Sequence, residues 1–456
     1  MTTATGNPKA FAVWFKDLDR WDVAYFRRIA WAWPVSFLRP LGEALVRQVR
    51  EVDPKTDKST VPIIEKISFG GEVSLSDPAG RAKYMGRLFW AEPGQLVYSK
   101  IRVKQGSLAV VPPSIPRLAV SAEYPVYRIK SAVADGAYLV LVLRSRAFQS
   151  FLEGLSHGGS TKTRLHPTEF ERLTVPLPPL AVQRAIVRRW QDAQAEVDKK
   201  KTTIAKLQED LEANLLQRIG IRLLPPSPPR GAFVLPWSEL DRWDTFYCRQ
   251  DFVDLDRQLT ATRARPLGEL VRFISRPWSR ADFPEGVFRY VEISGVTKEE
   301  GIHATRPVEV DKAPSRATTL IRAGDILLTT TRPYLGAFAI VPPEYDKCVC
   351  TSGFAVADAV DESRIDKRFL LHFLKSPAGL RQMERRMTGG LYPAIVQSEL
   401  EKVRVPLPPL KVQEGFVAEA EKVQEEVRTE RQAAAKLSAE VVKEVEEMIL
   451  GTRPVG

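Results

Sequence analysis

The residue types that carry most enzyme chemistry are scarce in this chain of 456 residues. It has three cysteines and four histidines, which are Cys248, Cys348, Cys350, His157, His166, His303 and His372. The C-x-C spacing of the last two cysteines is unusual for zinc, and no second CxxC or HxxxH pair completes a site. We therefore expect buried cysteine thiols in a reducing compartment, and histidines that pack in a core or lie on the surface.

The common catalytic motifs are also missing. The sequence contains no GxxxxGK[ST] phosphate-binding loop, no GxSxG and no HExxH motif. The Asn/Asp-Pro-Pro-aromatic motif of amino-methyltransferases is absent as well. Together these absences favour a binding protein over an enzyme, with no metal and no cofactor in this chain.

Basic side chains are the most abundant groups that could bind a partner. The formal net charge is +11, and residues 1–180 carry +9 while residues 231–410 carry +1. Such a balance indicates a polyanionic partner, nucleic acid above all, although an ordinary basic surface would give the same total.

The elements that must position these residues are encoded twice. VPLPPLAVQ at 175–183 returns as VPLPPLKVQ at 405–413, LDRWDVAY at 18–25 as LDRWDTFY at 240–247, and RPLGE at 39–43 unchanged at 265–269. The segment 93–113 matches 323–343, which pairs Gly94, Arg102 and Gly106 with Gly324, Arg332 and Gly336. Order is kept throughout, so the chain is a tandem duplication of a long unit rather than a short solenoid repeat.

Each unit has the same predicted plan. Short strands lead to one amphipathic helix (138–155 and 368–387), then a glycine loop, then the proline phrase, whose stiff prolines exclude helix and central strand. A long polar helix follows the phrase. We predict globular domains at 1–180 and 237–410, long helices at 181–220 and 411–450, and a linker at 221–236.

The long helices carry an imperfect seven-residue apolar repeat. At 39 residues, a helix is about 58 Å long, and a polar helix of this length needs a partner for its apolar stripe. The predicted seam consists of Trp190, Val197, Lys200, Ile204, Leu207, Leu211, Val423, Val427, Glu430, Leu437, Val441 and Met448. We predict an antiparallel coiled coil between two pseudo-symmetric α/β domains, in a mixed α+β fold. The alternative is two repeated domains that follow one another along the chain without such symmetry.

Two charges interrupt this seam near the helix midpoints. Lys200 and Glu430 meet in neighbouring layers if the helices are antiparallel. We predict that they pair and help to set the register, whereas two exposed charges on an irregular seam are the alternative.

The sequence shows no sign of a membrane segment. It has no run of 18 apolar residues, and its first residues lack a signal peptide's apolar core. We expect a cytoplasmic protein.

The chain resembles the specificity subunits of type I restriction–modification systems. The resemblance covers nearly the whole chain and rests on the repeated VPLPPLxVQ phrase before a long helix, on GDILLTTTRPYLGAFAIV (324–341), and on the segment 368–410. The first unit departs from the pattern, because Gln95 stands where Asp325 does and GGSTKTRLHPTEF replaces GGLYPAIVQSEL.

This resemblance implies two target-recognition domains, each of which recognises half of a bipartite sequence in double-stranded DNA. The long helices would set the gap between the half-sites and dock two modification subunits, which carry S-adenosylmethionine and methylate adenine. A motor-nuclease subunit is an optional further partner. This chain itself would be non-catalytic.

On that interpretation, loop residues with base-reading or phosphate-binding side chains are the candidate DNA contacts. They are Lys100, Arg102, Lys104, Lys162 and Arg164 in the first domain, and Arg276, Trp278, Arg280, Arg332, Tyr334 and Tyr392 in the second. Structural roles for Arg102 and Arg332, solvated surface roles for the other basic residues, and core packing of Tyr392 are the alternatives. At the level of the chain, a divergent single-chain methyltransferase or nuclease and a coiled-coil scaffold without DNA contact stay open.

Overall fold

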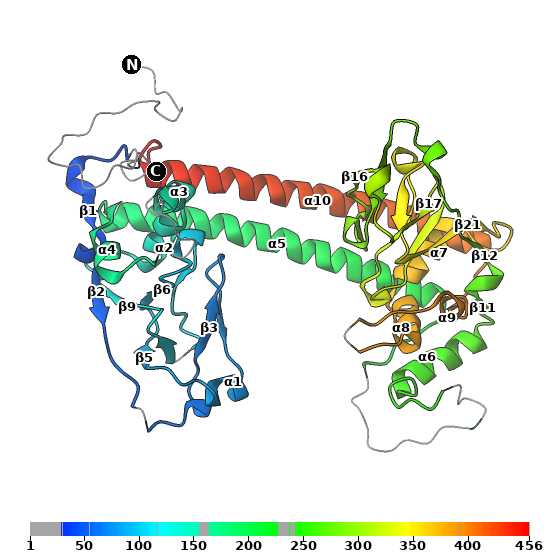
Figure 1. Ribbon diagram of the computed structural model, residues 1–456, viewed down its shortest axis with the longest axis horizontal. Helices are drawn as coiled ribbons and strands as arrows, with labels where there is room; N and C mark the ends of the chain where they lie inside the picture. The colour runs from blue at the N-terminus through cyan, green and yellow to red at the C-terminus, as the bar shows by residue number, and fades with distance from the viewer. Residues whose placement is uncertain are drawn as a thin grey trace. The chain divides into compact units, whose positions relative to one another are not determined.

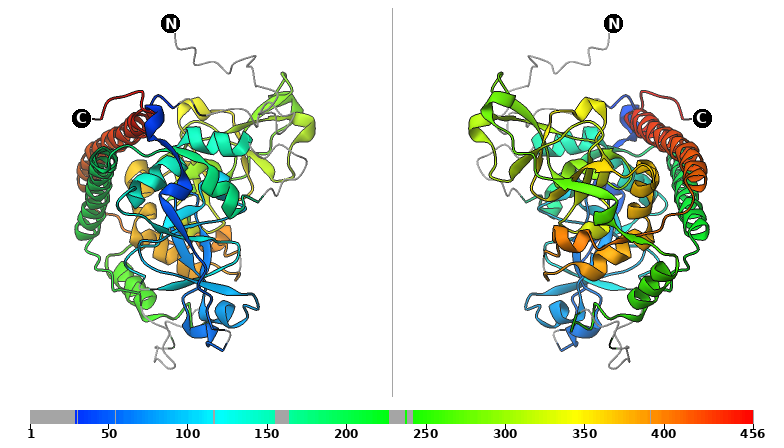
Figure 2. Two further views of the ribbon diagram at one scale, coloured as in Figure 1. Left: turned by 90° about the vertical axis from the view of Figure 1, so that its left-hand side faces the viewer. Right: turned by 90° about the vertical axis from the view of Figure 1, so that its right-hand side faces the viewer.

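The computed structural model describes residues 29, 31–53, 55–115, 117–154, 164–226, 237, 242–390 and 392–455. The chain divides into two compact units (Figure 1), which we call unit 1 (Met1–Lys200 with Gln432–Gly456) and unit 2 (Lys201–Arg431). Figure 2 shows the same ribbon from two further sides. None of the helices in the described ranges has both the length and the apolar character needed to span a membrane.

Unit 1 is built around a four-stranded antiparallel sheet of order β2-β9-β6-β7. Its strands are β1 Leu38–Pro40, β2 Leu45–Gln48, β3 Ile64–Ile67, β4 Val73–Leu75, β5 Leu88–Ala91, β6 Leu96–Tyr98, β7 Leu108–Val110, β8 Leu118–Ser121, β9 Val126–Ile129 and β10 Thr174–Pro176. Its helices are α1 Pro78–Ala82, α2 Gly136–Arg144, α3 Arg146–Gly154, α4 Pro167–Arg172 and the first part of α5 Leu180–Arg218.

Alternate side chains of this sheet enter two different cores. Leu96 and Tyr98 face a core shared with α2, α3, α4 and the long helices. Val97, between them, faces a second core made with the β3–β4 and β5–β8 pairs. A central strand buried on both faces is continuously apolar, as the LVY of β6 is.

Unit 2 repeats this plan with the sheet β12-β21-β18-β19 and adds a second four-stranded sheet, β16-β13-β20-β17. Its strands are β11 Arg265–Pro266, β12 Val271–Ile274, β13 Val287–Val291, β14 Val296–Thr297, β15 Gly301–Ile302, β16 Arg306–Glu309, β17 Ala317–Leu320, β18 Ile326–Thr329, β19 Phe338–Ile340, β20 Val349–Thr351, β21 Phe354–Val360 and β22 Arg404–Val405. Its helices are α6 Gln250–Ala261, α7 Lys367–Lys375, α8 Pro377–Arg386, α9 Gln397–Leu400 and the first part of α10 Leu410–Leu450.

The predicted mixed α+β fold with a duplicated unit is confirmed. The pairing of β1 with β10 returns as that of β11 with β22. The paired glycines also match in conformation: Gly94 and Gly324 have φ of 79° and 87°, and Gly106 and Gly336 have 88° and 66°. Each pair thus occupies the left-handed region that only glycine enters at no steric cost.

The prediction of one helix at 138–155 and one at 368–387 is wrong, because each is two helices. The break falls at Ser145 and Ser376, whose ψ values of 148° and 160° are extended. Ser376 ends α7 and accepts a hydrogen bond from the Gly379 backbone N–H to begin α8. Pro377 follows it, and a residue before proline is disfavoured in the helical region.

A buried glutamine explains the end of the repeated proline phrase. Gln183 is 0 % exposed; its Oε1 accepts from the Asp135 N–H (2.9 Å) and its Nε2 donates to the carbonyls of Val133 and Pro178. Asp135 in turn caps α2 by accepting from the Ala137 and Tyr138 N–H groups. One amide side chain therefore joins the turn before α2 to the start of α5.

Gln413 makes the same three bonds in unit 2 and is also 0 % exposed. Its Oε1 accepts from the Asp366 N–H (2.8 Å), and its Nε2 donates to the carbonyls of Arg364 and Pro408. Asp366 caps α7 as its counterpart caps α2. We call Gln183 and Gln413 the glutamine clamps.

The long helices pair within each unit. In unit 1, Arg189 of α5 forms an ion pair with Glu444 of α10 (2.7 Å). In unit 2, Arg218 of α5 pairs with Glu419 of α10 (2.5 Å), and Asn214 donates to the same carboxylate. The early part of α5 thus contacts the late part of α10 and the reverse, which is the predicted antiparallel order. The apolar seam residues are all buried or half-buried.

The two polar seam residues are half-buried as well. Lys200 belongs to unit 1 and Glu430 to unit 2. Their pairing stays a prediction.

Removal of a glutamine clamp should weaken its unit. We expect Gln413→Ala to lower the free energy of unfolding of unit 2 by about 2–4 kcal/mol, because buried N–H and carbonyl groups lose their partners. Urea unfolding gives the energy, and hydrogen exchange at the start of α7 locates it. Exposed Glu414, one residue on, provides the control Glu414→Ala; equal stability of the two variants would refute a clamp role.

Unit 2 should also lose stability in acid through one histidine. Burial lowers the pKa of His372, which packs against Phe416, from its usual 6.5 to about 4. The unfolded chain then binds the proton more tightly, so this contribution to stability is complete above pH 6.5 and is lost as the pH falls toward 4. We expect His372→Leu, which copies Leu141 of unit 1, to reduce the loss between pH 7 and 4.5 by about 2–3 kcal/mol.

Urea titrations at the two pH values test this expectation. The exposed His303→Ala variant is the control and should retain the wild-type dependence. An unchanged pH dependence in His372→Leu would contradict the assignment.

Candidate nucleic-acid interface

Two loops of unit 2 come together at the end of β18. The Arg332 N–H donates to the Pro393 carbonyl (2.8 Å), and the Ile395 N–H donates to the Thr330 carbonyl (2.8 Å). The loop after β18 is thereby joined to the glycine loop that follows α8. This joining brings three of the predicted contact residues, Arg332, Tyr334 and Tyr392, into one region, which we call the tyrosine–arginine cluster.

The side chains of this cluster are accessible. Tyr392 is 75 % exposed, Tyr334 is 38 % exposed, and the Arg332 guanidinium carbon lies 5.9 Å from the Tyr392 ring centroid. Within the described ranges, Arg332 makes no ion pair with a carboxylate. An aromatic face can stack on a base, and a free guanidinium can donate to base edges or phosphates. Next to them, exposed Leu335 is an apolar surface residue that we did not single out from the sequence.

Arg332 itself has a strained backbone. Its φ is +49°, in the left-handed region that a side chain other than glycine enters only at a cost. Arg102, its repeat partner, has φ of −113°. The two arginines, although matched in sequence, therefore have different backbone conformations.

The corresponding region of unit 1 holds the basic residues predicted there. Lys100, Arg102 and Lys104 lie in the turn between β6 and β7, and the Leu165 N–H donates to the Lys100 carbonyl (2.9 Å), as Ile395 does to Thr330. Arg164 forms an ion pair with Glu123 at 3.3 Å. Burial lowers the pKa of Lys104. Lys162 lies outside the described residues.

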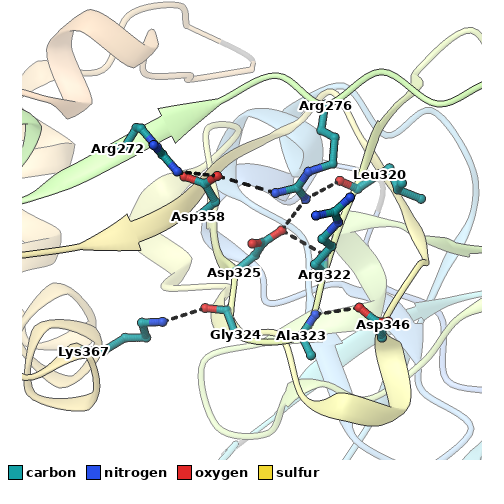
Figure 3. Close-up of polar contacts among 10 residues, drawn as sticks. All are labelled: Arg272, Arg276, Leu320, Arg322, Ala323, Gly324, Asp325, Asp346, Asp358 and Lys367. Carbon is teal, nitrogen blue, oxygen red and sulfur yellow. Dashed lines mark hydrogen bonds and ion pairs between the residues drawn. The ribbon is translucent and has the colours of Figure 1, made fainter.

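Arg276 has partners inside unit 2 (Figure 3). Its Nη1 donates to the Leu320 carbonyl (2.9 Å) and to Asp325 Oδ2 (2.8 Å), and its Nη2 lies 3.7 Å from Asp358. Leu320 ends β17 of the second sheet, whereas Asp358 lies in β21 of the first sheet and Asp325 directly precedes β18 of that sheet. The guanidinium thus joins the two sheets, and we call this contact the sheet joint.

The sheet joint is a buried ion pair. The side chain of Asp325 is 5 % exposed and that of Arg276 19 %. Asp325 Oδ2 also accepts from the Arg322 N–H (2.8 Å). Breaking such a pair strands a buried charge, although the intact pair says little about net stability. A hydrogen bond from Arg272 holds the pKa of Asp358 below its usual range, with the charges of Arg272 and Arg276 adding to the effect.

Unit 1 makes the same turn without the buried charge. Gln95 stands in the place of Asp325, and its Oε1 accepts from the Glu92 N–H (2.8 Å). Arg50, the repeat partner of Arg276, forms only an exposed contact with Glu92 at 3.4 Å. Where Gln95 replaces the buried carboxylate, the matching arginine, Arg50, is therefore exposed, whereas Arg276 is half-buried beside Asp325.

Trp278 and Arg280, the other two candidate residues in the loop after β12, differ in their surroundings. The Trp278 indole donates to the Ala317 carbonyl (2.7 Å) and packs against Phe283 and Phe288. Arg280 is largely exposed and pairs with exposed Asp311 (2.6 Å), a kind of pair worth about 0–1 kcal/mol. The side chains of Arg276 and Trp278 thus bind groups within unit 2, while that of Arg280 lies on the surface.

The described residues offer little for bond-making chemistry. Among them, no group of three or more His, Cys, Asp or Glu side chains could hold a metal ion. The three cysteines are buried and free, and burial raises the pKa of Cys350 to about 12. A thiol with such a pKa is a poor nucleophile at neutral pH.

Comparisons with known proteins find a family model that matches one part of the chain. Residues 265–437 match the family model of the type I restriction modification DNA specificity domain. No curated protein matches the sequence.

Solved structures are similar along most of the chain. One, from work on complex assembly and conformational transition of the type I R-M system, is 18 % identical, with 90 % of this chain and 97 % of that chain covered and a TM-score of 0.51. The HsdS subunit from Thermoanaerobacter tengcongensis is 20 % identical over 90 % and 95 %, with a TM-score of 0.38. The type I S subunit from M. genitalium is 12 % identical over 90 % and 95 %, with a TM-score of 0.43.

The first of these likenesses shows a shared fold, and most of the family match lies in unit 2, which holds the tyrosine–arginine cluster and the sheet joint. Residues 265–437 are therefore similar to the type I restriction modification DNA specificity domain, the family that the sequence motifs of this part of the chain resemble.

Proposed function

We propose that the chain is the specificity subunit of a type I restriction–modification enzyme. Two recognition domains, 1–180 and 237–410, each recognise one half of a bipartite sequence in double-stranded DNA. The observation that carries this proposal is the second occurrence, in unit 1, of the loop geometry found in the matched domain. In both units the same backbone bond, Leu165 to Lys100 and Ile395 to Thr330, presents basic or aromatic side chains.

Different residues have different parts in this proposal. Tyr392 and Tyr334 stack on or wedge against bases, and Arg332 donates to a base edge or phosphate. Lys100, Arg102, Lys104, Lys162, Arg164 and Arg280 are proposed to contact the backbone of the duplex. Arg276 and Trp278, by contrast, hold the sheets that carry these loops.

The long helices supply the spacing. A helix of 39 residues is about 58 Å long, the length of about 17 base pairs, which is enough to hold two domains on separate major-groove sites. Outward-facing residues of these helices dock two modification subunits, which bring S-adenosylmethionine and the adenine methylation chemistry. A motor-nuclease subunit is a further proposed partner.

Methylation mapping tests the proposal directly. We expect this chain, expressed with its modification subunits in a methylation-free host, to give modified adenine in a split motif with two short halves and a fixed gap. Arg332→Ala and Tyr392→Ala should relax or abolish one half and leave the other unchanged, at about 1–3 kcal/mol per lost contact.

Two controls separate recognition from folding. Arg276→Met breaks the sheet joint and should lower the stability of unit 2 without selecting different bases. Replacing residues 1–180 by those of a related subunit should change the other half alone. Absence of a split motif with active partners present would favour a protein scaffold, and methylation or cleavage by the purified chain alone would favour a divergent enzyme.

A further inference from the structure

Unit 1 contains an apolar groove beside its helix pair. The groove has a volume of about 940 Å³ and lies between α2, the long helices and the tip of the β3–β4 hairpin. Its apolar lining includes Val140, Leu141, Trp190, Val442 and Val445. A groove of this size and composition is a place where an apolar side chain could be buried.

The hairpin tip at the edge of this groove presents an exposed phenylalanine. Phe69 is 54 % exposed, and its carbonyl accepts a hydrogen bond from Arg144 Nη2 at the end of α2 (2.8 Å). Gly71, two residues on, has φ of +85°. Arg144 therefore holds the backbone of the tip next to the groove, while the Phe69 ring stays largely in solvent.

Unit 2 has the same hairpin, but there the tip is attached to the helix. Lys375, which corresponds to Arg144, donates to the Lys298 carbonyl (2.7 Å) at the tip of the β14–β15 hairpin. Lys298 then reaches α5 and forms an ion pair with Glu212 (2.7 Å). A backbone bond and a side-chain bond together tie this hairpin between α7 and α5.

Both ends of that side-chain contact become apolar in unit 1. Phe69 stands in the place of Lys298, since each follows the first hairpin strand and accepts from the cation at the end of α2 or α7. Val442 of α10 stands in the place of Glu212 of α5, because the repeated helices begin at Leu410 and Leu180. A charged pair in one unit thus corresponds to two apolar residues that line one groove in the other.

We propose that the β3–β4 hairpin is a strap that closes unit 1 onto its helix pair, with Phe69 inserted in the groove against Val442. Unit 2 illustrates the closed arrangement with an ion pair in place of the apolar contact. Closure buries the exposed ring in a groove that Phe69 already lines, while Arg144 keeps its bond to the backbone of the tip. Because its contact is apolar, the strap of unit 1 closes independently of salt, unlike that of unit 2. This inference does not depend on the proposed function.

Disulfide trapping in the full-length chain tests whether the tip reaches the helix. We expect Phe69→Cys/Val442→Cys to form an intramolecular disulfide at least about tenfold faster than the control Met85→Cys/Val442→Cys, because only the first pair comes within bonding range. Met85 is 91 % exposed and also belongs to unit 1, and the three native cysteines are buried. Equal rates for the two pairs would overturn the strap.

Hydrogen exchange gives a second test that needs no cysteine. The amides of residues 70–72 should exchange at least about tenfold faster in Phe69→Ser than in the wild type, at low and at high salt alike. Phe69→Lys/Val442→Glu, which copies unit 2, should restore protection at low salt and lose it at high salt. Wild-type exchange in Phe69→Ser would show that the ring does not hold the strap and would refute the proposal.

Discussion

The burial of one glutamine side chain in each unit is the contact on which the architecture depends. Gln183 and Gln413 each satisfy three backbone groups around the turn before α2 or α7, and each lies within the first turn of a long helix. Because the buried amide cannot exchange these partners for water, its hydrogen bonds fix the start of the long helix relative to the turn before α2 or α7. The proline phrase before it adds stiffness, so chain direction is determined over a few residues.

Duplication placed the same scaffold in both units, and divergence then changed its polar contacts. Unit 2 joins its sheets with the buried Arg276–Asp325 pair and its hairpin with Lys298–Glu212. In unit 1, Gln95 takes the position of Asp325. Phe69 and Val442 take the positions of Lys298 and Glu212. The backbone N–H groups of these turns keep their acceptors despite the exchange. The Gln95 side chain accepts from the Glu92 N–H, and the Asp325 side chain accepts from the Arg322 N–H, each at 2.8 Å. The fold therefore tolerates a change of charge wherever the backbone stays satisfied.

Residue roles at the candidate interface followed from the tertiary structure more than from residue type. Arg276 and Arg332 are both loop arginines of unit 2, yet the first guanidinium is half-buried beside three acceptors and the second lies on the surface beside Tyr392. Sequence position gave no means of separating them. Trp278 is likewise an indole with an internal acceptor, although its loop suggested exposure. Which loop atoms find partners depends on strands that are distant in the chain.

The sequence alone determined the duplication, the mixed α+β class and the two long helices, whereas the antiparallel order of these helices was a prediction that the contacts between α5 and α10 confirmed. These follow from local signals, because repeated phrases, prolines and a seven-residue apolar period need no knowledge of distant contacts. Only the tertiary structure decided that each predicted amphipathic helix is two, that Gln183 and Gln413 are clamps, and that Tyr392 meets Arg332. Each of these depends on hydrogen bonds or packing between segments far apart in the chain, which local pattern does not encode.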